Sequence, residues 1–256
     1  MKNITLISNW KLRDPYVAMF KGRLWKTIPD ARIIDITHAI DESIIEQTSF
    51  ILKTSYQSFP EGTLHIILTG NTLSHTSMPV MVEYNHHYFM GEDNGVFSLM
   101  FGGEPALNAV ELNLPDEQTT VLDKCILMAQ LHFEGQLKEK TVAYTNFVRK
   151  IQFSPEHDTL NRVITGQVTY IDTRCNAITN IPVDMFKEAV KNGNFSVSLS
   201  STRHITINRY HNFYNPKEEE IYMMGNPLGY LELTLNNGYI AVLADLKIGD
   251  KIEIRY

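Results

Sequence analysis

The strongest constraint on the fold is a change in the spacing of apolar residues near residues 153–162. Before this segment, short apolar runs alternate with stretches of helical periodicity, which indicates βαβ units and a mostly parallel sheet. After it, alternating or β-branched runs are separated by Asn and Gly, which is typical of a small antiparallel domain. We therefore predict an α/β domain with Rossmann-like layers at residues 1–152, a linker at 153–162 and a small all-β barrel at 163–256.

The first elements of the amino-terminal domain can be predicted individually. Residues 4–8 (ITLIS) and 31–37 (ARIIDIT) are short apolar runs and are predicted to be strands. A helix is expected between these two strands. Asp14 and Pro15 should start it, because Asp can cap free N–H groups and Pro suits the first turn. The run VMVEYNHHYFMG predicts a hairpin that turns near Asn85.

The segment LTGNTLSHTSMPV, residues 68–80, follows a predicted buried strand. A loop at the carboxyl end of such a strand is where an open α/β sheet usually holds its ligand. This loop contains no Asp, Glu, Arg or Lys, and its only titratable side chain is His75. Its position therefore indicates an active site, whereas its composition offers few groups for chemistry.

Composition limits the classes of partner. The 256 residues carry a net charge of −6 without a cluster of Lys and Arg, so we expect neither nucleic acid nor a membrane as partner. No apolar segment has the length of a membrane span, and no signal peptide is recognisable. Cys125 and Cys175 lie far apart, which favours free thiols in the cytoplasm. The nine histidines form no metal-binding pair, so no metal is expected, and no motif supports a Ser-His-Asp site.

Eight stretches fall in the order and spacing of one known family. They are DPYV, the KG of Lys21-Gly22, PDARIIDITH, FPEGTLHI, HYFMGEDNGVFS, YIDTRCNAITNI, GYLEL and LKIGDKIEI. Together they resemble the S-adenosylmethionine (SAM) hydroxide adenosyltransferase family, which includes the fluorinating and chlorinating adenosyl enzymes. The resemblance implies an α/β domain followed by a β-barrel domain. It also implies a homotrimer that holds SAM or adenosine between neighbouring subunits, without a further cofactor.

The catalytic positions of the family are occupied here by small or neutral residues. The resemblance to hydroxide-type members implies catalysis by an Asp, an Arg and a His. On alignment, Gly70 falls at the position of the Asp, Ser77 at that of the Arg and Thr120 at that of the His. The resemblance therefore implies that all three catalytic side chains are missing, with His75 as one possible substitute.

The binding positions are mixed: some match the family and others do not. The stretch SNWK, with Asn9 and Trp10, aligns with a TDFG-like stretch whose Asp binds the ribose, so that Asn9 keeps an acceptor but no charge. Asp14 and Asp172 match acidic residues of the family, Asp14 at a position near the methionine ammonium group. Asn176 matches the Asn that reads the adenine edge.

Three functions follow as hypotheses. The first is a divergent member that binds a nucleoside-type ligand at a subunit interface and has lost hydrolysis. The second is an active SAM hydrolase, forming adenosine and methionine, that uses other residues such as His75. The third is a structural or interaction role for a trimer with a closed cleft.

Overall fold

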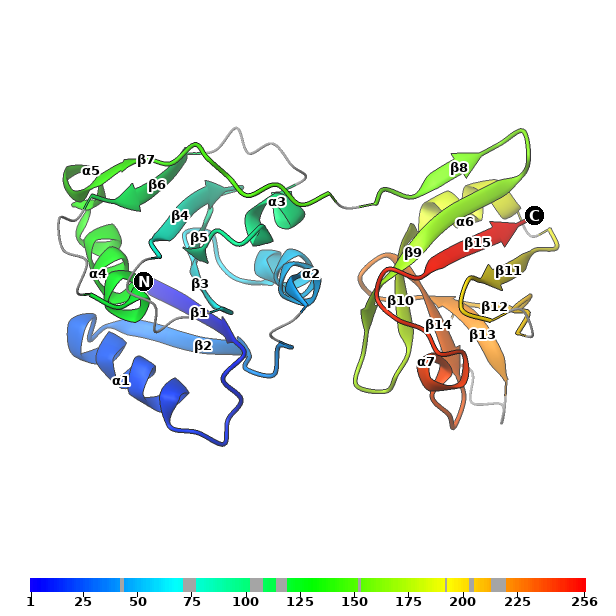
Figure 1. The fold of residues 1–256 in the computed structure, drawn as a ribbon, viewed down its shortest axis with the longest axis horizontal. Coiled ribbons are helices and arrows are strands. Elements are labelled where there is room, and N and C mark those ends of the chain that lie inside the picture. The colour runs from blue at the N-terminus through cyan, green and yellow to red at the C-terminus, as the bar shows by residue number, and fades with distance from the viewer. Residues whose placement is uncertain are drawn as a thin grey trace. The chain divides into compact units, whose positions relative to one another are not determined.

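The computed structural model describes residues 1–41, 44–70, 77–101, 108–113, 119–151, 153–191, 193–202, 205–212 and 220–256. The chain divides into two compact units, Met1–Ile151 and Gln152–Tyr256. Unit 1 is an α/β structure and unit 2 is built mainly of strands (Figure 1). None of the described helices is long and apolar enough to cross a membrane.

Unit 1 contains one seven-stranded sheet in the order β2-β1-β3-β5-β4-β6-β7. Its strands are β1 (Lys2–Ser8), β2 (Ala31–Thr37), β3 (Leu64–Leu68), β4 (Pro79–Tyr84), β5 (His87–Glu92), β6 (Asn108–Leu112) and β7 (Thr141–Ala143). Its helices are α1 (Tyr16–Thr27), α2 (Ile45–Ser55), η1 (Tyr56–Ser58), α3 (Val96–Phe101), α4 (Val121–Glu134) and α5 (Leu137–Lys140).

The prediction of a mostly parallel sheet is wrong, because the sheet is mixed. The neighbours β2, β1, β3 and β5 are parallel, whereas β4, β6 and β7 join by antiparallel pairing. The cause is the predicted hairpin, in which Tyr84 pairs with His87 across a two-residue turn. Asn85 and His86 both have positive φ, at 47° and 63°. This is the geometry of a tight turn that reverses the chain.

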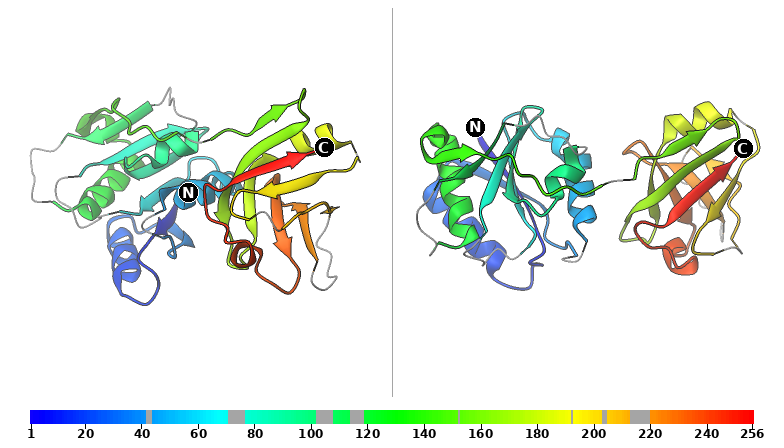
Figure 2. Two further views of the ribbon diagram at one scale, coloured as in Figure 1. Left: turned by 45° about the vertical axis from the view of Figure 1, so that its right-hand side comes forward. Right: turned by 45° about the horizontal axis from the view of Figure 1, so that its top comes forward.

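Helices cover both faces of this sheet (Figures 1 and 2). Alternate residues of a strand point to opposite faces. On one face, Leu64 and Ile66 of β3 pack in a core with α1 and α4. On the other face, Ile67 packs in a second core with α2 and α3. The buried run of β3 therefore contributes to two cores, and the strand ends at the edge between them.

The expected cap of the first helix is not formed. Helix α1 begins at Tyr16, its N-cap position is occupied by Pro15, and no side chain caps it. Asp14 is exposed. The first turn is closed instead by a backbone hydrogen bond from Met19 to the carbonyl of Pro15, so the Asp14 carboxylate is not used by the helix.

Helix α4 is capped at both ends. The Thr120 hydroxyl accepts a hydrogen bond from the Asp123 N–H, and the Asp123 carboxylate accepts one from the Thr120 N–H. Gly135 ends the helix in the left-handed conformation with φ 74°. Arg23 of α1 forms an ion pair with Asp123. The cap thereby fixes the start of α4 against α1.

Unit 2 contains a curled sheet in the order β11-β15-β9-β10-β14-β13-β12, with β8 added beside β9. Its strands are β8 (Glu156–Asp158), β9 (Val163–Ile171), β10 (Ala177–Pro182), β11 (Ser196–Leu199), β12 (Tyr210–His211), β13 (Ile221–Gly225), β14 (Tyr230–Leu235) and β15 (Lys251–Arg255). Its helices are α6 (Val183–Val190) and α7 (Ile240–Leu243). The sheet encloses one apolar core, and a closed barrel is not confirmed. The segment predicted as a linker contains β8.

A chain of polar side chains lies inside unit 1. The Thr5 hydroxyl lies 2.7 Å from Nδ1 of His65, whose Nε2 lies 3.2 Å from Nδ1 of His87. The Tyr56 ring lies nearly perpendicular to both imidazoles. Burial, followed by the nearby charge of His87, lowers the pKa of His65 from 6.5 to about 3. The folded chain therefore holds His65 neutral at pH values where an exposed His is protonated.

We expect Thr120→Ala to lower the free energy of unfolding of unit 1 by about 1 kcal/mol, because it removes the cap of α4. Thr120→Ser keeps the hydroxyl and should retain most of the stability. Both tryptophans, Trp10 and Trp25, lie in unit 1, so urea denaturation followed by tryptophan fluorescence measures this unit. Equal stability of the Ala variant and the native protein would contradict the capping role.

We also expect unit 1 to lose stability in mild acid. Between its folded pKa of about 3 and its unfolded value of 6.5, His65 binds a proton only in the unfolded chain. Its contribution is therefore complete above pH 6.5 and is lost as the pH falls toward 3. Between pH 6.5 and about pH 5, His65 should lower the free energy of unfolding of unit 1 by about 1.5 kcal/mol. This window lies above the pH range in which most carboxylates are protonated.

The measurement is urea denaturation by tryptophan fluorescence at several pH values in this window. His65→Asn, whose amide can keep the contact with Thr5 without titrating, should show a shallower loss than the native protein. His86→Asn is the matched control, because His86 is exposed in a turn of positive φ that Asn tolerates. Equal slopes for the native protein and His65→Asn would refute the assignment.

Candidate functional site

The connectivity of unit 1 places a ligand-binding edge beside β1. Strand β1 lies between β2 and β3, and all three are parallel. After β1 the chain runs to β2 on one side of β1 and then to β3 on the other side. The loops after β1 and β3 therefore lead away from each other at the carboxyl edge of the sheet. Such a switch point is where open α/β sheets bind ligands. Because Ser8 pairs with Leu68, residues 9 and 69 emerge side by side.

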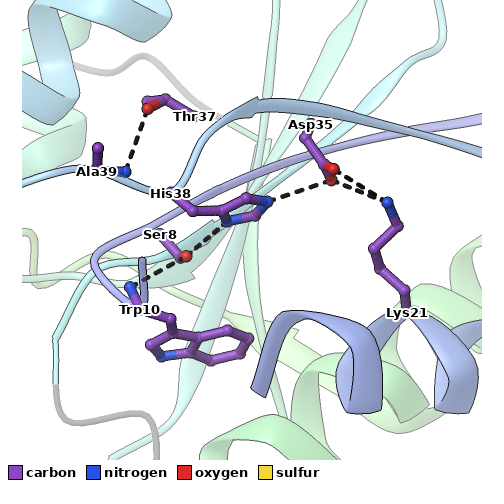
Figure 3. A network of polar contacts seen from close by, with 7 residues as sticks. All are labelled: Ser8, Trp10, Lys21, Asp35, Thr37, His38 and Ala39. Atoms are coloured by element: carbon purple, nitrogen blue, oxygen red, sulfur yellow. Dashed lines mark hydrogen bonds and ion pairs between the residues drawn. The ribbon is translucent and has the colours of Figure 1, made fainter. Parts of the chain in front are cut away.

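The loop after β1 is held by His38, which follows β2 (Figure 3). Nδ1 of His38 lies 2.7 Å from the Ser8 hydroxyl, and that hydroxyl accepts a hydrogen bond of 3.3 Å from the Trp10 N–H. The His38 carbonyl accepts a second bond of 2.7 Å from the Lys11 N–H. Lys11 has a φ of 63°, so the loop reverses here. His38 thus fixes the start of the loop through both its side chain and its backbone.

Asp35 lies on the other side of the His38 ring. One carboxylate oxygen lies 3.2 Å from Nε2 of His38, without the alignment of a hydrogen bond, and both oxygens accept from Lys21. Burial raises the pKa of Asp35, but the hydrogen bonds from Lys21 and the close contact with His38 outweigh it, so the pKa is lowered. The row Ser8-His38-Asp35 resembles a catalytic triad. Ser8 is fully buried and its hydroxyl is engaged, so the row serves to hold the loop.

The residues predicted for this loop differ in their surroundings. Asn9 has a buried Oδ1 that finds no hydrogen-bond partner in the part of the chain that the structure describes. The Trp10 ring is half-buried and meets Phe20 edge-on at 5.8 Å, with Tyr16 at 6.4 Å. Asp14 is exposed and lies beyond the loop, next to α1. Asn9 therefore has a free acceptor, whereas Trp10 mainly supports the loop by packing.

Gly70, after β3, lies against a carboxylate from the neighbouring strand. A Cβ atom at Gly70 would lie 2.7 Å from Oε2 of Glu92, the last residue of β5. The φ of Gly70 is 148°, a conformation that favours glycine. A negative charge thus lies beside the loop although the loop contains none. Glu92 lies in one of the family-like stretches, but its position in the sequence does not connect it with Gly70, because only strand pairing brings the two residues together.

A basic side chain reaches the other end of the same loop. The amino group of Lys124 donates a hydrogen bond of 3.1 Å to the carbonyl of Ser77. Lys124 lies on α4 and only 2% of it is exposed. The signal in the sequence is a lysine on the apolar side of a helix, between Val121 and Met128. Lys124 was not among the residues predicted for the site.

Other predicted positions do not extend the site. Thr120 is the cap of α4, and its hydroxyl donates to Asp123. His75 lies outside the described residues. No group of three or more His, Cys, Asp or Glu that could hold a metal occurs among the residues that the structure describes.

Asp172 and Asn176 belong to unit 2, in the turn between β9 and β10. Asp172 accepts hydrogen bonds from the N–H groups of Arg174 and Asn176 and from the Asn176 side chain. The Asn176 Oδ1 accepts from the Thr234 hydroxyl. Within unit 2 these two residues satisfy each other's hydrogen-bonding groups as a turn. Asn9 and Gly70 belong to unit 1.

Unit 2 also contains a pocket of about 490 Å³ that includes none of the predicted site residues. It is lined by Phe186, Lys187, Val190, Lys191, Gly193, Phe195, Tyr210 and Asn212. Its lining includes the apolar side chains of Phe186, Val190 and Phe195, and its two lysines are exposed. The pocket offers no pair of acid and base groups, so the carboxyl edge of the unit 1 sheet is the stronger candidate for chemistry.

Known proteins resemble the chain over both units. A curated (R)-S-adenosyl-L-methionine hydrolase of Methanocaldococcus jannaschii is 23% identical over 99% of this chain and 95% of its own. The hydrolase of the same name from Thermus thermophilus is 25% identical, over only 45% of each chain. A crystal structure titled as an uncharacterized conserved protein from Thermotoga maritima has a TM-score of 0.85 at 22% identity, with 99% and 100% coverage.

Two family models cover most of the sequence. The model of the SAM hydroxide adenosyltransferase N-terminal domain matches residues 4–131. That of the C-terminal domain matches residues 166–253. The matches lie in unit 1 and unit 2 respectively. The chain therefore belongs to the SAM hydroxide adenosyltransferase family.

Proposed function

We propose that the protein binds SAM at the carboxyl edge of the unit 1 sheet and hydrolyses it to adenosine and methionine. The observation that carries this proposal is the pair of charged groups beside the loop after β3. Glu92 lies against Gly70, and Lys124 contacts Ser77. These are two of the three positions at which the family's charged residues are missing. Family membership and relatives named as SAM hydrolases support the same reaction.

The reaction makes modest demands on the protein. The sulfonium of SAM is an excellent leaving group, so the site must align a water with the 5′ carbon, accept a proton and exclude bulk solvent. A carboxylate can accept the proton and also attracts the cationic sulfonium. Glu92 is the described carboxylate nearest to Gly70 and therefore suits this role.

The loop after β1 suits the ribose. The Oδ1 atom of Asn9 is buried without a partner among described residues, and a ribose hydroxyl would satisfy it. Trp10 supports the same loop from below by packing on Phe20. In a trimer of the family's kind, Asp172 and Asn176 of a neighbouring subunit would complete the site, as the resemblance implies.

The second candidate is binding of the nucleoside without turnover. It is favoured by the uncharged positions Gly70 and Ser77 and by Thr120, which is committed to capping α4. Loss of one acid–base group typically costs about 10²–10⁴ in rate. If Glu92 does not replace the missing acid–base group, the site can do little more than hold the ligand and a water in position.

Titration calorimetry and product analysis separate these functions. We expect heat of binding with adenosine and with SAM, and the time-dependent appearance of adenosine and methionine in chromatograms. Asn9→Ala should weaken adenosine binding, because it removes the free acceptor, whereas Asn108→Ala, at an exposed position of β6, should not. Binding without products would support the second candidate. Absence of heat with both compounds would contradict both and indicate a closed cleft.

A further inference from the structure

We propose that Glu92 is the proton acceptor for the attacking water, in place of the acidic residue missing at Gly70. This inference rests on the proposed hydrolysis and names the residue that performs it. The inference is based on how close the Glu92 carboxylate lies to Gly70. The Glu92 carboxylate lies where a side chain at position 70 would begin, so any residue larger than glycine there would collide with it.

Strand pairing delivers Glu92 to this place. Gly91 pairs with Ile67 of β3, and a Cβ at Gly91 would lie 2.7 Å from the Ile67 carbonyl oxygen. The absence of a side chain at Gly91 therefore allows β5 to approach β3 closely. Glu92 is the next residue and comes to lie beside the first residues of the loop after β3. Gly91 is thus needed for the approach of the two strands, and Gly70 leaves room for the carboxylate.

Among the residues that the structure describes, the side chains that follow Glu92 in the chain are engaged in hydrogen bonds within the protein, whereas the Glu92 carboxylate is not. Asp93 accepts hydrogen bonds from the Tyr144 hydroxyl, at 2.9 Å, and from the Val148 N–H, at 2.7 Å. Asn94 donates to the Thr69 carbonyl. Glu92 is half-buried, and its carboxylate makes no hydrogen bond or ion pair within the described ranges. Its neighbours hold the backbone, which leaves its carboxylate for a ligand or water.

Glu92 also points toward α4, the helix of Lys124. Met90 and Glu92 lie two residues apart on β5 and so share one face of the sheet. Met90 packs in the core that includes Cys125, and the negative charge of Glu92 adds to burial in raising the pKa of the Cys125 thiol. A carboxylate and a buried lysine thus approach the loop from the same side. Lys124 acts as a positioning residue by holding the Ser77 carbonyl.

The proposed step is balanced without a further reagent. The water oxygen forms a bond to the 5′ carbon of SAM, and the bond between that carbon and sulfur breaks. The electron pair of the broken bond goes to sulfur, which leaves as neutral thioether in methionine. The proton of the water goes to Glu92, which later returns it to solvent. The products are adenosine and methionine.

The test compares Glu92→Gln, Glu92→Asp and the control Glu83→Gln in the full chain. Glu83 is an exposed residue of β4 that pairs with Tyr88, away from the end of β5. Adenosine formation from SAM is followed by chromatography, adenosine affinity by calorimetry, and folding by thermal denaturation. Glu92→Gln should lower kcat by about 10²–10⁴ while adenosine still binds.

Two further readouts distinguish proton transfer from a structural role. The pH profile of the native rate should have an acidic limb that is absent from the residual rate of Glu92→Gln. Glu92→Asp should recover part of the rate, and Glu83→Gln should match the native protein. Turnover by Glu92→Gln at the native rate would overturn the inference, as would a native protein that binds adenosine but forms no products. A native protein that does not bind either compound would instead overturn the proposed function.

Discussion

The close approach of β3 and β5 is the constraint on which the site depends. Gly91 allows the strands to come together at Ile67, and Gly70 leaves room for the carboxylate that this approach delivers. A side chain at either glycine would displace Glu92 or the loop. The pairing of β3 with β5 thus places a carboxylate at the carboxyl edge of the sheet. The described residues of the loop after β3 carry no charged side chain.

The second support of the site is the polar contact between β1 and the end of β2. His38 binds the Ser8 hydroxyl with its ring and the Lys11 N–H with its carbonyl. Both contacts flank Asn9 and Trp10 in the chain, so the loop that we propose for the ribose is held in place by contacts within the protein. Preorganisation of this kind reduces the entropy lost on binding. The same geometry in a protease would be a triad, but a fully buried Ser8 cannot reach a substrate.

Much of the fold could be predicted from the sequence, because apolar periodicity and turn residues are local signals. The strands β1, β2 and β3, the hairpin at Asn85 and the change to β structure all follow from them. The mixed sheet did not, since periodicity gives no direction of pairing. The sequence pointed to the loop after β3 and to residues such as Asn9 and Trp10, but not to Glu92 or Lys124. Glu92 and Lys124 reach the loop from β5 and α4, and only tertiary structure reveals such contacts.

The central claim is that the charge missing from the loop after β3 is supplied by Glu92. A crystal structure with bound adenosine tests it most directly, because the 5′ hydroxyl of adenosine contains the oxygen that water contributes. We predict that a Glu92 carboxylate oxygen lies within hydrogen-bond distance of this hydroxyl, with the ribose beside Asn9. Adenosine bound at this edge with Glu92 turned away from its 5′ carbon, or bound at another surface, would contradict the account.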